Sequence, residues 1–166
     1  MPRHAALALT PMLLAAFLLS WSRPSATQAP AVGADPARFP ASGAGNISPD
    51  THLVLTFRTA PAVGRTGQIR VMDAASRSVV DTIDVGVPPA LQHDAIGGFA
   101  EGFHFYPVIV NGTTATVTLH HNVLSYGRSY TVQVDPGALT ADGFSGLTDW
   151  TFRTRCLNTP GQHACH

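Results

Sequence analysis

Lysine is absent from the chain, and charged residues make up only 12% of its 166 residues. Arginine therefore carries every formal positive charge, and the arginines neither cluster along the sequence nor alternate with aromatic residues. Two of them, Arg3 and Arg23, lie in the amino-terminal leader, which leaves the rest of the chain slightly acidic. Nucleic-acid binding relies on a basic face that neutralises phosphates, so this composition argues against a nucleic acid partner.

Carboxylates suited to acid–base catalysis are scarce as well. Glu101 is the only glutamate, whereas a glycosidase needs two carboxyl groups held across a cleft. Asp81 and Asp84 fall on opposite faces of one predicted strand, and we interpret them as solvated edge residues. Residues 143–147 approximate a serine-nucleophile turn but lack its final glycine. We therefore expect no enzymatic activity and no cofactor.

There are two cysteines, Cys156 and Cys165, both near the carboxyl end. Outside the cytoplasm we expect them to pair, and the bridge would stabilise a short loop by about 2 to 3 kcal/mol in the chain-entropy model. A loose tail with two free thiols is one alternative. A metal site is another, because His163 and His166 flank Cys165.

The amino terminus has the order of a secretory signal peptide. Arg3 precedes an apolar stretch over residues 5–21, and small and polar residues then lead to Ala29-Pro30-Ala31. We predict a signal peptide over residues 1–31, a linker over residues 32–37, and a secreted, periplasmic or cell-envelope location without a stable membrane span after cleavage. An uncleaved anchor is the alternative, although Thr10 and Pro11 interrupt the apolar stretch.

Beyond the linker, apolar and polar residues alternate over short runs, which is the period of half-buried strands. Each such strand has one apolar face that only a second sheet can cover. We therefore predict an all-β fold, an immunoglobulin-like antiparallel sandwich of two sheets and about seven strands over residues 38–154, followed by a tail with a disulfide loop over 155–166. The predicted strands cover residues 52–57, 68–72, 79–85, 103–110, 114–121, 130–134 and 150–152.

Local signals refine this prediction. Asn111-Gly112 predicts a hairpin with a type I′ turn, which requires positive φ at both residues. Residues 39–50 are rich in turn formers, and residues 86–102 are expected to form a long connection between strands. The largest core side chains, worth about 1.5 to 3 kcal/mol each when buried, should be Phe57, Tyr130, Trp150 and Phe152.

Three segments resemble a known family, the SbsA-like bacterial Ig-like domains. The opening segment consists of Phe39-Pro40, Ser48-Pro49-Asp50-Thr51 and the strand 53–57, and the closing segments are residues 127–139 and 150–154. Residues 106–110 with 115–120 are similar to the amino-terminal module of some secreted pectinesterases. The resemblance covers about residues 39–154 and implies an accessory module, because in those proteins a separate β-helix carries the esterase chemistry. It implies no catalytic residues in this chain.

Aromatic and histidine residues supply the candidate binding sites. The aromatic residues expected in loops would form a sugar-stacking platform, or alternatively serve as core and lid residues. They are Phe99, Phe103, Phe105, Tyr106 and Phe144. A metal site is an alternative that the eight histidines suggest. Its ligands would be His93, Asp94, Glu101 and His104.

The adjacent His120 and His121 are predicted to lie on one strand and to point to opposite faces, so that they could not share one ion.

Together these patterns predict an exported, non-catalytic module that spaces or docks an extracellular or cell-envelope partner, either a protein or a polysaccharide. The similarity to the pectinesterase module implies a link to pectin degradation. One alternative is a truncated pectinesterase-type protein that lacks its catalytic β-helix. Another is a small histidine-rich metal-binding protein.

Overall fold

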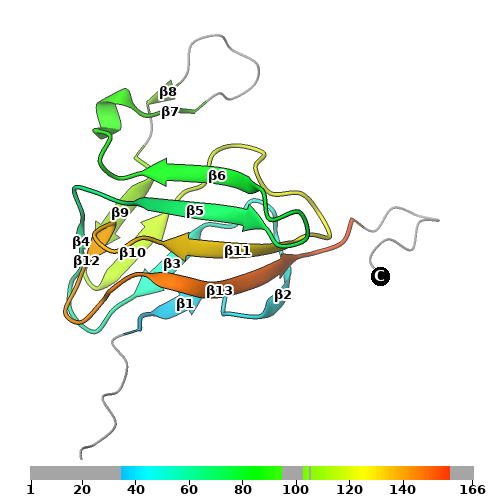
Figure 1. Ribbon diagram of the computed structural model, residues 1–166, viewed down its shortest axis with the longest axis horizontal. Helices are drawn as coiled ribbons and strands as arrows, with labels where there is room; N and C mark the ends of the chain where they lie inside the picture. Colours follow the sequence, from blue (N-terminus) through cyan, green and yellow to red (C-terminus); the bar gives the residue numbers. More distant parts are fainter. Residues whose placement is uncertain (1–34, 95–102, 105, 158–166) are drawn as a thin grey trace, which may run out of the picture. The chain divides into compact units, whose positions relative to one another are not determined.

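The computed structural model describes residues 35–94, 103–104 and 106–157 (Figure 1). These residues form short strands and one 3₁₀ helix, with no α-helix among them, so the predicted all-β class is confirmed. No helix in this part of the chain has the length and apolar character needed to cross a membrane. The predicted signal peptide and most of the carboxyl-terminal tail lie outside the described residues.

Four strands form the first sheet, in the order β1-β3-β10-β9. All of its neighbouring pairs are antiparallel. These strands are β1 (Ala37–Phe39), β3 (Leu53–Thr56), β9 (Val108–Asn111) and β10 (Thr114–Val117).

Five strands form the second sheet, in the order β2-β13-β11-β5-β6. Its pairs are antiparallel except for β13 with β2, which is parallel. The strands are β2 (Ala44–Ile47), β5 (Gln68–Asp73), β6 (Val79–Asp84), β11 (Ser129–Val134) and β13 (Leu147–Thr154).

Two small pairs complete the fold. β4 (Ala62–Val63) pairs with β12 (Leu139–Thr140). β7 (His93–Asp94) pairs with β8 (Phe103–His104). The 3₁₀ helix η1 (Pro89–Leu91) precedes β7 in the connection that leaves β6.

The two main sheets contain more strands than the sequence predicts, and not every pair is antiparallel. Residues 37–47, predicted to hold the end of the linker and part of a turn-rich segment, form β1 on the first sheet and β2 on the second. Gly43, with φ 78°, lies between them and donates its N–H to the carbonyl of Thr151. This segment has no apolar alternation because it pairs at the sheet edges, so the sequence gives little sign of its strands.

Buried side chains from both sheets form one hydrophobic core. The four predicted core residues are confirmed, since Phe57, Tyr130, Trp150 and Phe152 are 7%, 2%, 0% and 2% exposed. These residues are buried because apolar side chains alternate along the central strands and the inward ones pack between the two sheets. The arrangement is β-sandwich-like. The aliphatic part of the core is Leu53, Leu55, Ile69, Val71, Ile83, Val117, Leu124, Val132, Val134, Leu139 and Leu147.

The hairpin between β9 and β10 is present, but its turn is not the predicted one. Asn111 pairs with Thr114, so the two central residues are Gly112 and Thr113. Only Gly112 has a positive φ, 57°, whereas Asn111 does not. A single glycine with positive φ at the first central position is typical of a type II′ turn. The type I′ prediction was wrong because the register is shifted by one residue from the one assumed.

Asp73 organises the turn between β5 and β6. Its Oδ1 accepts hydrogen bonds from the backbone N–H groups of Ala75 and Ser76 at 2.9 Å each. The backbone hydrogen bond from Ser76 is the largest cause that lowers the pKa of this carboxyl below its ordinary value of 3.8, and it acts against the opposing effect of burial. The Ser76 hydroxyl, the Ala75 N–H and the charge of Arg128 lower the pKa further.

A carboxyl whose pKa falls on folding stabilises the fold only while it is ionised. The stabilisation by Asp73 is thus complete above its unfolded pKa and lost as pH falls through the lower folded value. We expect Asp73→Asn to be less stable than the wild type at pH 7, and the difference to shrink below about pH 4. Urea unfolding of both proteins at pH 7 and pH 3 measures this. An equal difference at both pH values would contradict it.

Candidate functional site

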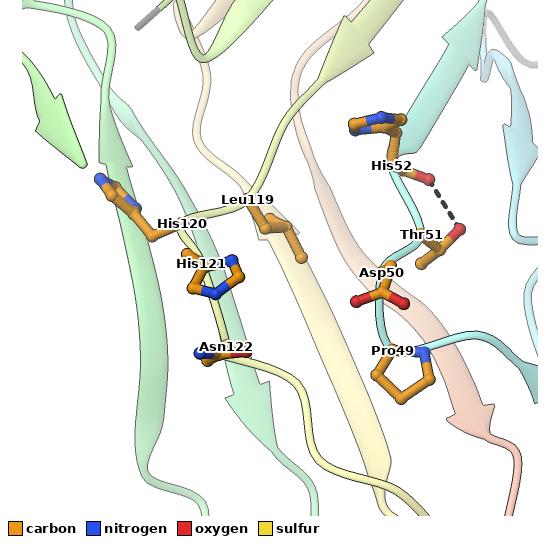
Figure 2. Close-up of a pocket in the computed structure, with 8 residues that line it drawn as sticks. All are labelled: Pro49, Asp50, Thr51, His52, Leu119, His120, His121 and Asn122. Carbon is orange, nitrogen blue, oxygen red and sulfur yellow. Dashed lines mark hydrogen bonds between the residues drawn. The ribbon is translucent and has the colours of Figure 1, made fainter. Parts of the chain in front are cut away.

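A polar pocket lies where β3 and β10 separate. Val117 pairs with Leu53, and the chain segments beyond this pair diverge. Residues 49–52, which lead into β3, form one wall, and residues 119–122, which follow β10, form the other (Figure 2). The cavity between them has a volume of about 140 Å³. Its lining residues are Pro49, Asp50, Thr51, His52, Leu119, His120, His121 and Asn122.

Local backbone geometry brings two adjacent histidines into this pocket. β10 ends at Val117, so His120 and His121 are not on a strand as predicted. They lie at the start of a turn in which Asn122 takes a φ of 59°. The alternation of a strand therefore does not apply to them, and both line the same cavity (Figure 2).

A buried carboxylate orients one of these imidazoles. The Asp81 side chain is 4% exposed, and its Oδ1 lies 2.7 Å from Nδ1 of His120. The Asp81 Oδ2 accepts a hydrogen bond from the backbone N–H of His120 at 3.0 Å. The interpretation of Asp81 as a solvated edge residue was therefore wrong. Asp81 lies on β6 at the edge of the second sheet, but it points inward and binds a segment that leaves the first sheet.

The arrangement consists of a buried carboxylate hydrogen-bonded to a histidine. A carboxylate that fixes the ring of a histidine is used both in acid–base catalysis and behind metal ligands. The hydroxyl of Thr51, in the opposite wall, donates to the carbonyl of His52 at 3.1 Å (Figure 2). Across the described residues, no group of three or more histidine, cysteine, aspartate or glutamate side chains is placed to hold a metal ion. The pocket thus offers hydrogen-bonding groups and imidazoles to a small polar ligand.

The predicted aromatic platform is only partly within the described residues. Tyr106 is 64% exposed. Phe144 packs against the core, with its ring perpendicular to that of Phe57 and the centroids 5.3 Å apart. The backbone of Phe103 lies in β8, whereas Phe99 and Phe105 lie outside the described residues. The platform therefore remains a prediction for Phe99, Phe103 and Phe105.

The alternative metal site is also incompletely described. The β7–β8 register pairs His93 with His104 and Asp94 with Phe103. This brings two of the predicted ligands to facing backbone positions. Glu101 lies outside the described residues, so this site also stays a prediction. For the predicted disulfide, Cys156 is described and Cys165 is not, and their pairing remains a prediction as well.

No protein-family model matches the chain, and a search of the curated proteins found no match.

Proposed function

We propose that the chain is an exported, non-catalytic Ig-like module that spaces or docks an extracellular or cell-envelope partner. The order of the strands is the observation that carries this proposal. Immunoglobulin-like sandwiches have strands A, B, E and D in one sheet and C, F and G in the other, with C′ added in variable-type domains. Lettered in chain order, β1-β3-β10-β9 corresponds to A-B-E-D, and β13-β11-β5-β6 corresponds to G-F-C-C′.

A tyrosine hydrogen bond supports the same architecture. Tyr130 is the second residue of β11, the strand that corresponds to F, and its hydroxyl accepts the backbone N–H of Ser125 at 2.7 Å. A tyrosine near the start of strand F that bonds to the backbone a few residues upstream is a recurring feature of Ig-like domains. The resemblance of residues 39–154 to SbsA-like domains agrees with both features.

The support for a docking role comes from the sequence. The predicted leader directs the chain out of the cell, and the similarity to an amino-terminal module of secreted pectinesterases favours an accessory role beside polysaccharide-degrading proteins. Because folds of this kind host many functions, the role must be tested on the protein itself. A truncated pectinesterase-type protein remains the alternative, and coding sequence for a β-helix downstream of His166 would favour it.

We expect the full chain, expressed with its own leader in a secreting host, to be collected outside the cytoplasm with a new amino terminus at Val32. The collected protein should not accelerate the hydrolysis of pectin methyl esters, polygalacturonate or nitrophenyl esters above the rate in buffer. Amino-terminal sequencing and titration of released acid measure these two outcomes. Retention of Met1 would contradict export by cleavage, and hydrolysis at enzyme-like rates would overturn the non-catalytic role.

A further inference from the structure

Several arginines that are separate in the sequence lie at one end of the second sheet. Here β5 and β13 end and β11 begins (Figure 1). We call this region the arginine–tyrosine end, and it consists of Arg77, Arg128, Arg153, Arg155 and Tyr126. All but Arg153, which is half-buried, are exposed.

Backbone pairing holds these residues together. Arg153 is paired with Ser129, the neighbour of Arg128, and Arg128 donates its backbone N–H to Thr154 Oγ1 at 3.0 Å. The carbonyl of Arg155 accepts the N–H of Gly127, the neighbour of Tyr126, at 2.9 Å.

The turn that carries Arg77 joins the same end. Ala74 in this turn donates its N–H to the carbonyl of Ser129 at 2.9 Å. Arg153 lies in β13, whereas the other four residues lie in turns or irregular segments next to strand ends. These backbone hydrogen bonds hold the segments against the sheet.

The positive charge here exceeds the acidic charge that contacts it. In the described part of the chain, the carboxylate that contacts these arginines is that of Asp73, whose Oδ2 lies 3.8 Å from Nη1 of Arg128. Its Oδ1 already accepts the hydrogen bonds of the β5–β6 turn. Within the described residues, neither Arg77 nor Arg153 forms an ion pair. Guanidinium groups without an ion-pair partner are suited to carboxylate ligands, which they bind through two parallel hydrogen bonds.

An exposed aromatic ring lies beside these charges. Tyr126 is 41% exposed, and the guanidinium carbon of Arg155 lies 5.7 Å from its ring centroid. Both residues line an open pocket of about 360 Å³ together with Asn46, Cys156 and Leu157. Aromatic rings with a polar tip stack on sugar rings, while neighbouring polar groups bond to the hydroxyls.

We propose that the arginine–tyrosine end binds a polysaccharide that carries carboxylate groups, that is, a polymer of uronic acids. Arg153 and Arg155 bind sugar carboxylates, Tyr126 stacks on a sugar ring, and Asn46 bonds to hydroxyls in the pocket. This inference rests on the proposed docking function and gives that function a ligand class and a surface. An anionic lipid surface would use the charges but not the ring, which is why the pocket favours the sugar.

Binding of the collected full-length protein to sodium polygalacturonate, measured by calorimetry and affinity electrophoresis, tests the proposal. Fully methyl-esterified polygalacturonate has the same backbone without the charge and serves as the matched polymer. Vesicles of phosphatidylglycerol and phosphatidylcholine serve as the lipid probe. The variants are Arg153→Gln with Arg155→Gln, and Tyr126→Ala. The charge-matched control is Arg58→Gln with Arg65→Gln, because these exposed arginines lie in the connection before β5, at the opposite end of that strand.

We expect the wild type to bind the charged polymer and not the esterified one, and to bind more weakly as salt rises. The Arg153, Arg155 pair of substitutions and Tyr126→Ala should each weaken binding by about ten-fold, with the melting temperature unchanged. The control should stay within about two-fold of the wild type. Binding to vesicles but not to the polymer, equal binding of both polymers, or an equal loss in the control would each overturn the proposal.

Failure of this proposal is distinct from failure of the proposed function. If the protein is exported, does not hydrolyse the test substrates and does not bind uronate polymers, the proposed non-catalytic function still holds. Only the proposed ligand is then wrong. Hydrolysis of polygalacturonate would instead contradict the proposed non-catalytic function, regardless of how the variants change binding.

Discussion

Replacing Trp150 by alanine is expected to lower the free energy of unfolding by about 4 kcal/mol, a large share of the stability of a small domain. Trp150 is 0% exposed and pairs with Val132 at the centre of the second sheet. Its indole N–H donates to the carbonyl of Pro40 at 2.8 Å, in a buried contact. Alanine would leave a cavity in the core and an unpaired carbonyl in the segment between β1 and β2.

Two further variants separate these effects. Trp150→Phe keeps much of the apolar volume but removes the donor, so we expect a loss of about 2 kcal/mol. Thr148→Ala changes an exposed position of the same strand and should stay within about 0.5 kcal/mol of the wild type. Urea unfolding followed by tryptophan or tyrosine fluorescence measures all three. A change below about 1 kcal/mol for Trp150→Ala would mean that Trp150 does not anchor this core.

The sequence predicts the interior of the fold better than its edges. Strands such as β5 and β11 have a strict alternation, and their inward residues Ile69 and Val71 pair with Val134 and Val132. Burial decides their register, so a period of two is enough to find them. β1 and β2 pair at the edges, and their backbone hydrogen bonds leave no such period in the sequence. The parallel pairing of β2 with β13 is a long-range contact that no local pattern encodes.

The candidate pocket was missed for a related reason. Asp81 shares the inward face of β6 with Ile83, so the alternation already placed it toward the core. Its charge favoured the opposite interpretation, because an unpaired buried carboxylate is costly. The partner that offsets this cost, His120, is 39 residues away in the chain. The arginine–tyrosine end is likewise assembled by register, since Arg77 and Arg153 are separate in the sequence.

Replacing Asp81 by alanine is expected to lower the free energy of unfolding by about 3 kcal/mol. The change removes both hydrogen bonds to His120 and leaves its partly buried backbone N–H without an acceptor. It also removes the connection between the edge strand β6 and the segment that follows β10. Asp81→Asn keeps one acceptor oxygen and should cost about half as much. Thr82→Ala, at an exposed position of β6, should have little effect.

A double-mutant cycle shows whether Asp81 acts through His120. His120→Ala removes the ring but keeps the backbone N–H, so it should cost less than Asp81→Ala. Since the two side chains contact each other at 2.7 Å, the double variant should be more stable than the sum of the single losses predicts, by about 1 kcal/mol. Additive losses would mean that the carboxylate serves the backbone alone. In that case Asp81 would not orient the imidazole of His120.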